Sequence, residues 1–215
     1  MSDILGYGED SLTLWALRHR RPLILQEFDD STSPTDCLAF YRPSFGRRGG
    51  RGSQFGEFDG ILVSGRNVYL IESKWKKVDS LDSLRPEQEL RHRIFAWYLT
   101  HWGKEYELGQ HERDWGAFRQ KCSDCFRRDF ETDRKTIPTS RTELARNLRS
   151  TLSRIRTHYE RYSSKQCIES QNVKNVLLFF HRGGTSPPPE FSKSDFCLIA
   201  IDYGDDALDS FIDLS

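Results

Sequence analysis

The chain has no apolar stretch long enough to span a bilayer, and its first residues, MSDILGYGED, are acidic and contain glycines. We therefore expect neither a membrane span nor a signal peptide, and we expect a cytoplasmic protein. The 5 cysteines are odd in number and irregularly spaced, which argues against the disulfide framework of a secreted domain. The formal net charge is zero, with 32 basic and 32 acidic residues, so any nucleic-acid contact must come from local basic clusters.

What the chain does contain is enough material for one folded domain. Its 215 residues can bury a sizeable core as a single α/β unit, and no internal repeat divides them. Charged residues make up 30% and hydrophobic residues 36% of the chain, which is polar for a globular protein but rich in aromatic side chains. We therefore expect residues 1–215 to form one domain.

The most informative segment reads GEFDGILVSGRNVYLIESK, residues 56–74. It consists of two apolar runs with a turn at Ser64–Asn67 between them, which predicts a β-hairpin. Asp59 stands at the outer end of the first run, and Glu72 and Lys74 stand at the outer end of the second. Because side chains alternate along a strand, Glu72 and Lys74 project from the same face. We expect two carboxylates and an ammonium group to converge there.

This pattern of an Asp, twelve intervening residues, a Glu, one residue and a Lys resembles the PD-(D/E)XK nuclease superfamily, which has the restriction-endonuclease-like fold. The resemblance implies that Asp59 and Glu72 bind Mg²⁺ or Mn²⁺ and that Lys74 lies beside the attacking water. It also implies a central mixed β-sheet flanked by helices. Phe58 stands where the name of the motif has Pro, but that position is not a metal ligand.

The same chemistry follows from the residue types. Phosphodiester hydrolysis needs an activated water and a counter-charge for the transition state, and a divalent cation supplies both. Carboxylate ligands suit Mg²⁺ or Mn²⁺, and no His, the residue that Zn²⁺ would favour, lies between Glu57 and Lys74. The alternative is a buried ion pair between Glu72 and Lys74 that only stabilises the strand end.

Further candidates flank the hairpin. Glu9 lies in the first turn of a helix predicted over Gly8–His19, where the resemblance implies a carboxylate that completes the metal site. A Glu there also simply favours the helix dipole. Gln88, in the helix that follows the hairpin, is a second accessory candidate by resemblance. It and the cluster Arg91, His92 and Arg93 either face the scissile phosphate or form a polar, solvent-facing helix start. Glu57 is either a further ligand or a solvated strand end. The predicted catalytic residues are Asp59, Glu72, Lys74, Glu9 and Gln88, with Asp59, Glu72 and Glu9 as metal ligands.

Two basic regions are candidates for phosphate contact. The first is the glycine-rich loop RPSFGRRGGR, which contains Arg42, Arg47, Arg48 and Arg51. The second is the helix predicted over Arg141–Tyr162, in which Arg149 lies outside the apolar stripe. Solvated surface charge is the alternative for both regions.

The remaining elements fit the expected sheet. We predict a strand around Cys37–Tyr41, a helix that begins at Pro86, and two buried strands over Val173–His181 and Asp195–Tyr203. Residues 103–139 are more than the core needs and predict a helical insertion. We expect this insertion to determine substrate recognition or to form a homodimer contact.

The function expected from the sequence is a metal-dependent nuclease, with an endonuclease favoured and DNA as substrate, although RNA is left open. One alternative is an inactive nuclease-like module that binds nucleic acid or a protein partner. The other is a zinc-containing interaction domain built on Cys122 and Cys125. Against zinc, both cysteines fall on the apolar face of a predicted helix, together with Trp115 and Phe118.

Overall fold

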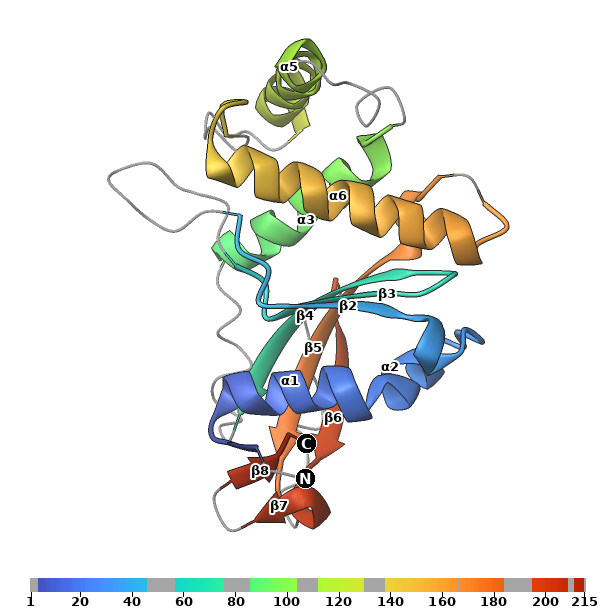
Figure 1. The fold of residues 1–215 in the computed structure, drawn as a ribbon, viewed down its shortest axis with the longest axis vertical. Coiled ribbons are helices and arrows are strands. Elements are labelled where there is room, and N and C mark those ends of the chain that lie inside the picture. The colour runs from blue at the N-terminus through green and yellow to red at the C-terminus, as the bar shows by residue number, and fades with distance from the viewer. Residues whose placement is uncertain are drawn as a thin grey trace.

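A computed structural model describes residues 4–45, 57–75, 86–103, 112–129, 138–165, 167–183, 195–208 and 211–214. The described chain is an α/β structure with a central mixed sheet of five strands and five α-helices (Figure 1). In this part of the chain, no helix is both long enough and apolar enough to cross a membrane.

The central sheet has the strand order β2-β3-β4-β5-β6. Its strands are β2 (Leu38–Tyr41), β3 (Gly60–Val63), β4 (Val68–Trp75), β5 (Val173–His181) and β6 (Cys197–Asp202). The pairs β2·β3 and β3·β4 are antiparallel, whereas β4·β5 and β5·β6 are parallel. The predicted hairpin is therefore confirmed, and its second strand, β4, is the centre of the sheet.

Helices cover both faces of this sheet. Helices α1 (Glu9–His19) and α2 (Arg21–Glu27) lie on one face, and α3 (Pro86–His101) and α6 (Glu143–Tyr162) lie on the other, with α5 (Glu112–Asp129) beyond them (Figure 1). A small sheet of β1 (Leu5–Gly6), β8 (Phe211–Asp213) and β7 (Ala207–Leu208) brings the two ends of the chain together. Short 3₁₀ turns occur at Pro34–Asp36, Ser170–Asn172 and Gly204–Asp206.

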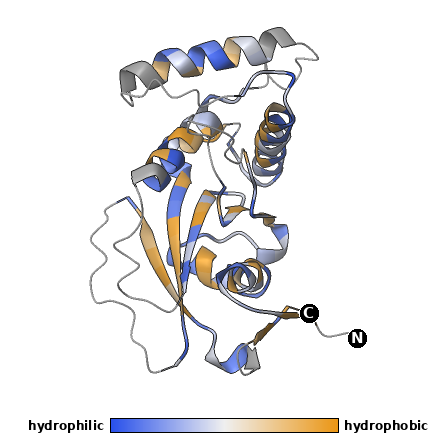
Figure 2. Ribbon diagram, turned by 90° about the vertical axis from the view of Figure 1, so that its left-hand side faces the viewer, coloured by the Kyte–Doolittle hydropathy of each residue, from blue (hydrophilic) through white to orange (hydrophobic). Residues whose placement is uncertain are grey.

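The alternation of side chains along β3 and β4 produces two cores. Val68 and Leu70 face the core formed by α3, α5 and α6, while Tyr69 and Ile71 face the core formed by α1 and α2. Figure 2 shows the hydrophobic residues concentrated in the strands between these helices. Because both faces of β4 are buried, the charged residues at its end are held at the margin of a dry interior.

The predicted elements agree with the observed ones in kind and order. Helix α6 begins two residues later than predicted, because the Thr142 side chain accepts a hydrogen bond from the Ala145 N–H and caps the helix there. The described part of residues 103–139 contains α5, which confirms the helical content of this segment. The sequence analysis did not predict α2 or the small sheet.

A buried carboxylate fixes the β3–β4 turn. Asp30 accepts hydrogen bonds from the Ser64 hydroxyl at 2.5 Å, the Tyr69 hydroxyl at 2.7 Å and Asn67 Nδ2 at 3.0 Å. It also accepts one from the Thr32 N–H at 3.0 Å. Burial alone would raise the pKa of Asp30, but these hydrogen bonds more than offset it, so the pKa lies below its ordinary value. The ionised carboxylate therefore stabilises the hairpin that presents the candidate site.

This network predicts a pH-dependent cost for Asp30→Asn. The side-chain amide of Asn would point N–H groups at neighbours that are themselves donors. We therefore expect the free energy of unfolding to fall by about 2–3 kcal/mol at pH 7. Because the folded pKa is lowered, the stability that Asp30 contributes is complete above about pH 4 and is lost as the pH falls through the folded pKa. Urea unfolding at about pH 7 and about pH 3 should show the difference from the wild type shrink at acid pH.

The matched control is Asp29→Asn. Asp29 is exposed and has a left-handed backbone with φ 49°, which Asn tolerates. We expect a change within about 0.5 kcal/mol at either pH. An equal loss for the two variants would contradict the role of Asp30.

Candidate active site at the end of strand β4

The site begins where β4 continues past β3. Gly60, the first residue of β3, pairs with Ile71, so the last residues of β4 have no β3 residue opposite them. There, the Ser73 N–H donates a hydrogen bond to Asp59 Oδ2 at 2.8 Å. The Asp59 carboxylate thus replaces a missing strand partner, and this contact holds it beside Glu72 and Lys74.

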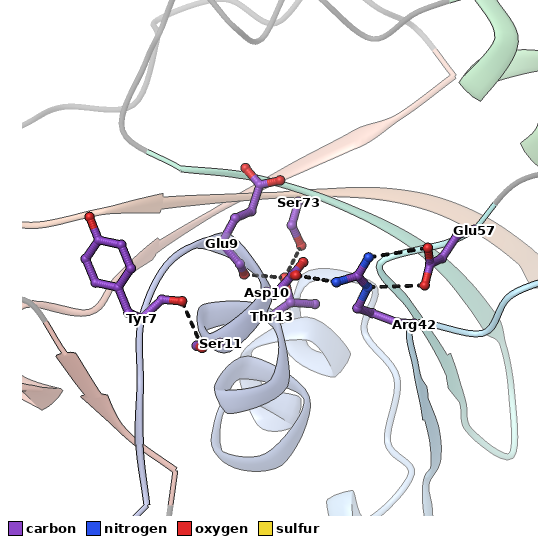
Figure 3. A network of polar contacts seen from close by, with 8 residues as sticks. All are labelled: Tyr7, Glu9, Asp10, Ser11, Thr13, Arg42, Glu57 and Ser73. Atoms are coloured by element: carbon purple, nitrogen blue, oxygen red, sulfur yellow. Dashed lines mark hydrogen bonds and ion pairs between the residues drawn. The ribbon is translucent and has the colours of Figure 1, made fainter. Parts of the chain in front are cut away.

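The two faces of β4 are used differently at this end. Ser73 faces α1, where its hydroxyl lies 2.8 Å from the Thr13 hydroxyl (Figure 3). Glu72 faces α3 and contacts side chains of its first turns. The predicted alternation of these neighbouring residues is confirmed.

Glu9 joins this group from α1, of which it is the first residue. Burial raises its pKa, and the Glu72 charge adds to this effect, whereas Lys74 and a hydrogen bond from the Trp75 N–H lower it. Figure 3 shows the Glu9 carboxylate projecting away from α1 on the side where β4 passes. Glu9 is therefore an electrostatic neighbour of the residues at the end of β4, and its role as a metal ligand stays a prediction.

The pKa of the Asp59 carboxyl group is strongly raised. Burial and the charges of Glu72 and Glu9 raise its pKa to about 7, although Lys74 and the Ser73 N–H act in the opposite direction. A carboxylate with this pKa is held where its negative charge is poorly compensated. Strongly perturbed groups of this kind are concentrated in functional sites.

Glu72, in contrast, is almost fully compensated. Only 2% of its side chain is exposed. Its Oε1 accepts from Arg91 and lies 3.0 Å from His92 Nε2, and its Oε2 accepts from Gln88 Nε2 at 2.8 Å. Burial alone would raise the pKa of Glu72, but the hydrogen bond from His92 and the charge of Arg91 lower it overall. Helix α3 thus keeps Glu72 ionised.

The position of His92 explains how Glu72 is oriented. His92 is fully buried, with its ring 5.0 Å from that of Phe58 and 4.7 Å from that of Phe196. Its Nδ1 lies 2.9 Å from Asn175 Oδ1 on β5. His92 therefore holds Glu72 from one ring nitrogen and is itself held by β5 at the other.

These contacts decide between two hypotheses for Glu72. A buried ion pair with Lys74 is not among the contacts of the described residues, and Arg91, His92 and Gln88 occupy the carboxylate instead. Within the same described residues, no three His, Cys, Asp or Glu side chains form a ready-made metal-binding group. The carboxylates are therefore electrostatic neighbours that do not yet share one coordination centre.

The predicted phosphate-binding arginines have different positions. Arg42 forms ion pairs with Asp10, through Nη1, and with Glu57, to which Nε and Nη2 donate at 3.2 and 3.3 Å (Figure 3). These contacts neutralise Arg42 and use Glu57 as its partner. Arg47, Arg48 and Arg51 lie outside the described residues.

Arg149 lies in a different environment from the carboxylates. Its guanidinium is 5.3 Å from the centre of the Trp115 ring, and its Nε is buried without a hydrogen-bond partner among the described residues. This contact joins α6 to α5. The structure gives Arg149 a packing role, and its predicted contact with phosphate stays a prediction.

The cysteine pair on α5 belongs to the hydrophobic core. Cys122 is fully buried together with Trp115 and Phe118, and burial raises the pKa of its thiol. Cys125 is partly buried one turn further along. The helical apolar face predicted for these residues is confirmed.

The sequence analysis underestimated three contributors. Arg91 and His92 were considered as side chains facing the scissile phosphate and not as partners of Glu72, although residues 88, 91 and 92 have the spacing that places side chains on one helix face. Asn175 was not recognised at all, although it interrupts the apolar run of β5 with a polar side chain.

Comparison of the chain with protein-family models, with curated proteins and with solved structures finds no match.

The raised pKa of Asp59 predicts that Asp59→Asn stabilises the protein in a chelating buffer. A carboxyl with a raised folded pKa stabilises below its unfolded pKa, and this contribution is lost as the pH rises from about 4 through about 7. At about pH 8 the variant should therefore unfold at a higher urea concentration. Its free energy of unfolding should exceed that of the wild type by about 1–2 kcal/mol after allowance for solvent screening. The advantage should vanish towards pH 4.

Asp205→Asn, at an exposed position, is the control and should show no such trend. A destabilised Asp59→Asn at pH 8 would mean that the carboxylate is a structural group.

Proposed function

We propose that this protein is a metal-dependent nuclease that hydrolyses phosphodiester bonds in DNA. The observation that supports this most is the uncompensated carboxyl of Asp59, with a pKa of about 7, next to Glu72, Glu9 and Lys74 at one strand end. The mixed sheet flanked by helices and the spacing of Asp59, Glu72 and Lys74 agree with a restriction-endonuclease-like enzyme. This assignment to the PD-(D/E)XK superfamily is part of the proposal.

The donor atoms suit a hard divalent cation. Asp59, Glu9 and Glu72 offer carboxylate oxygens, which Mg²⁺ and Mn²⁺ prefer. A bound cation would relieve the repulsion that raises the pKa of Asp59, so the residues fit such a group on electrostatic grounds. When bound, it would supply an activated water and a counter-charge for the transition state.

Each residue then has a separate task. The Ser73 N–H holds Oδ2 of Asp59, and the other carboxylate oxygen would be offered to the cation. The contacts with α3 fix the side-chain rotamer of Glu72, which would contribute a second carboxylate charge. The charge of Lys74 lowers the pKa values of both Asp59 and Glu9, which supports a role in which its ammonium orients the attacking water.

A second candidate function is a nuclease-like module that binds nucleic acid without cutting it. It is favoured by one observation, namely that Gln88, Arg91 and His92 already occupy the Glu72 carboxylate. In an inactive module these contacts would persist, whereas in an active enzyme at least one of them must yield to the cation.

The decisive experiment is a cleavage assay. Purified protein should be incubated with supercoiled plasmid, linear duplex, single-stranded DNA and RNA, each in Mg²⁺, in Mn²⁺ and in EDTA. We expect cleavage of DNA that depends on the cation. Products from closed circular plasmid would demonstrate the endonuclease activity that we favour. Binding without cleavage under every condition would support the inactive module.

Active-site variants separate the proposed roles. Asp59→Asn should abolish cleavage because the cation loses a charged ligand, while the fold persists. Lys74→Met should reduce the turnover number by about 10²- to 10⁴-fold with cation binding unchanged, since a positioned acid or base contributes on this scale. Circular dichroism should be identical for all three proteins.

The controls come from an exposed ion pair on the surface, Lys165 and Glu169. Lys165→Met and Glu169→Gln change the same charges and should cleave at the wild-type rate. Wild-type cleavage by Lys74→Met would show that Lys74 has no part in the chemistry.

A further inference from the structure

The contacts of Glu72 contain a conflict that the proposed function must resolve. Its Oε1 already contacts both Arg91 and His92, so a divalent cation that used this oxygen would meet the positive charge of the Arg91 guanidinium and would compete with His92 for the same oxygen. Like charges at such distances repel strongly in a buried site. One of the two donors must therefore move before Glu72 can serve as a ligand.

Arg91 is the donor that can move. The His92 side chain is 0% exposed and is held at its other nitrogen by Asn175, whereas the Arg91 side chain is 14% exposed. Gln88 donates to the other oxygen and carries no charge, so it does not oppose a cation. His92 and Gln88 are thus fixed partners of Glu72, whereas the Arg91 guanidinium is the partner that can be displaced.

The environment of the Arg91 guanidinium is incomplete in its present position. Its Nε is buried and has no hydrogen-bond partner among the described residues, and its centre lies 5.1 Å from the centre of the Phe58 ring. An unpaired buried donor costs free energy. Leaving Glu72 would return this N–H to solvent or to a new acceptor, which lowers the cost of displacement.

We propose that Arg91 is a resident counter-ion of Glu72 that competes with the divalent cation and, once displaced, binds the phosphate of the substrate. This inference rests on the proposed nuclease function. A planar guanidinium binds phosphate oxygens in pairs, and a displaced Arg91 remains on the helix that borders the site. Exchange of partners keeps the charges balanced, because the cation replaces the guanidinium at Glu72 and the phosphate replaces Glu72 at the guanidinium.

The test measures Mn²⁺ affinity by calorimetry and turnover on DNA for Arg91→Met. Loss of the competing charge should tighten Mn²⁺ binding by about tenfold or more, since a hydrogen bond to a charged group is worth about that factor. The increase in melting temperature on addition of Mn²⁺ should exceed that of the wild type. The turnover number should nevertheless fall, because the phosphate contact is lost.

Two further variants make the test specific. Arg93→Met removes an exposed arginine from the same helix and should leave affinity and turnover unchanged. If Arg91→Met does not fold, Arg91→Gln replaces it, since the amide still donates a hydrogen bond without the charge. Arg91→Lys should keep the competition but recover only part of the turnover, because an ammonium lacks the planar pair of donors.

The outcomes distinguish the two proposals. Equal or weaker Mn²⁺ binding by Arg91→Met, with normal binding by the wild type, would overturn the competition and leave the nuclease proposal standing. Tighter binding with undiminished turnover would overturn the phosphate contact. Absence of Mn²⁺ binding by every protein would overturn the nuclease proposal, and this inference with it.

Discussion

The Ser73 N–H requires an acceptor that β3 cannot provide, and the Asp59 carboxylate provides it. This hydrogen bond forces an acidic side chain into the same space as Glu72, at the margin of two hydrophobic cores. Most other features of the site follow from the resulting excess of negative charge. Helix α3 brings Arg91 and His92 to Glu72, the charge of Lys74 lowers the pKa values of Asp59 and Glu9, and Glu9 joins the group from the first turn of α1.

The protein treats its two central carboxylates unequally. His92 and Arg91 of α3 lower the pKa of Glu72, while Asp59 receives one backbone hydrogen bond and has a pKa of about 7. A structure selected only for stability would compensate both or replace one with an apolar residue. Local departures from stability are typical of sites retained for function. The difference in charge compensation between Glu72 and Asp59 is therefore better support for a functional site than the presence of two acidic residues alone.

The elements of the fold were predictable where a regular pattern extends over enough residues. The hairpin, α3 and α6 have clear periodicity, and the alternation along β4 correctly separated Glu72 from the residue after it. Helix α2 was missed because it has only seven residues, and packing of Ile24 and Leu25 stabilises it more than its local sequence does. The small sheet joins strands from both ends of the chain, and no local pattern predicts such pairing.

The candidate site was predictable in its residues but not in its contacts. The spacing of Asp59, Glu72 and Lys74 is local, so the chain itself indicates that they converge. Partners such as Arg42 for Asp10, or His92 for Asn175, are far apart in sequence and depend on how the elements pack. For the same reason, a buried pair of Glu72 with Lys74 was as reasonable from sequence as the observed pair with Arg91.

Helix α3 has a different duty at each end. Its first turns hold Glu72, while Tyr98 in its last turn, together with Trp102 just beyond its end, packs on Phe118 of α5. A helix of 16 residues is about 24 Å long, so these two sets of contacts lie near opposite ends of one element. The aromatic contact with α5 therefore helps to fix the helix that holds the Glu72 carboxylate. The orientation of this carboxylate thus depends on packing outside the site as well as on the hydrogen bonds within it.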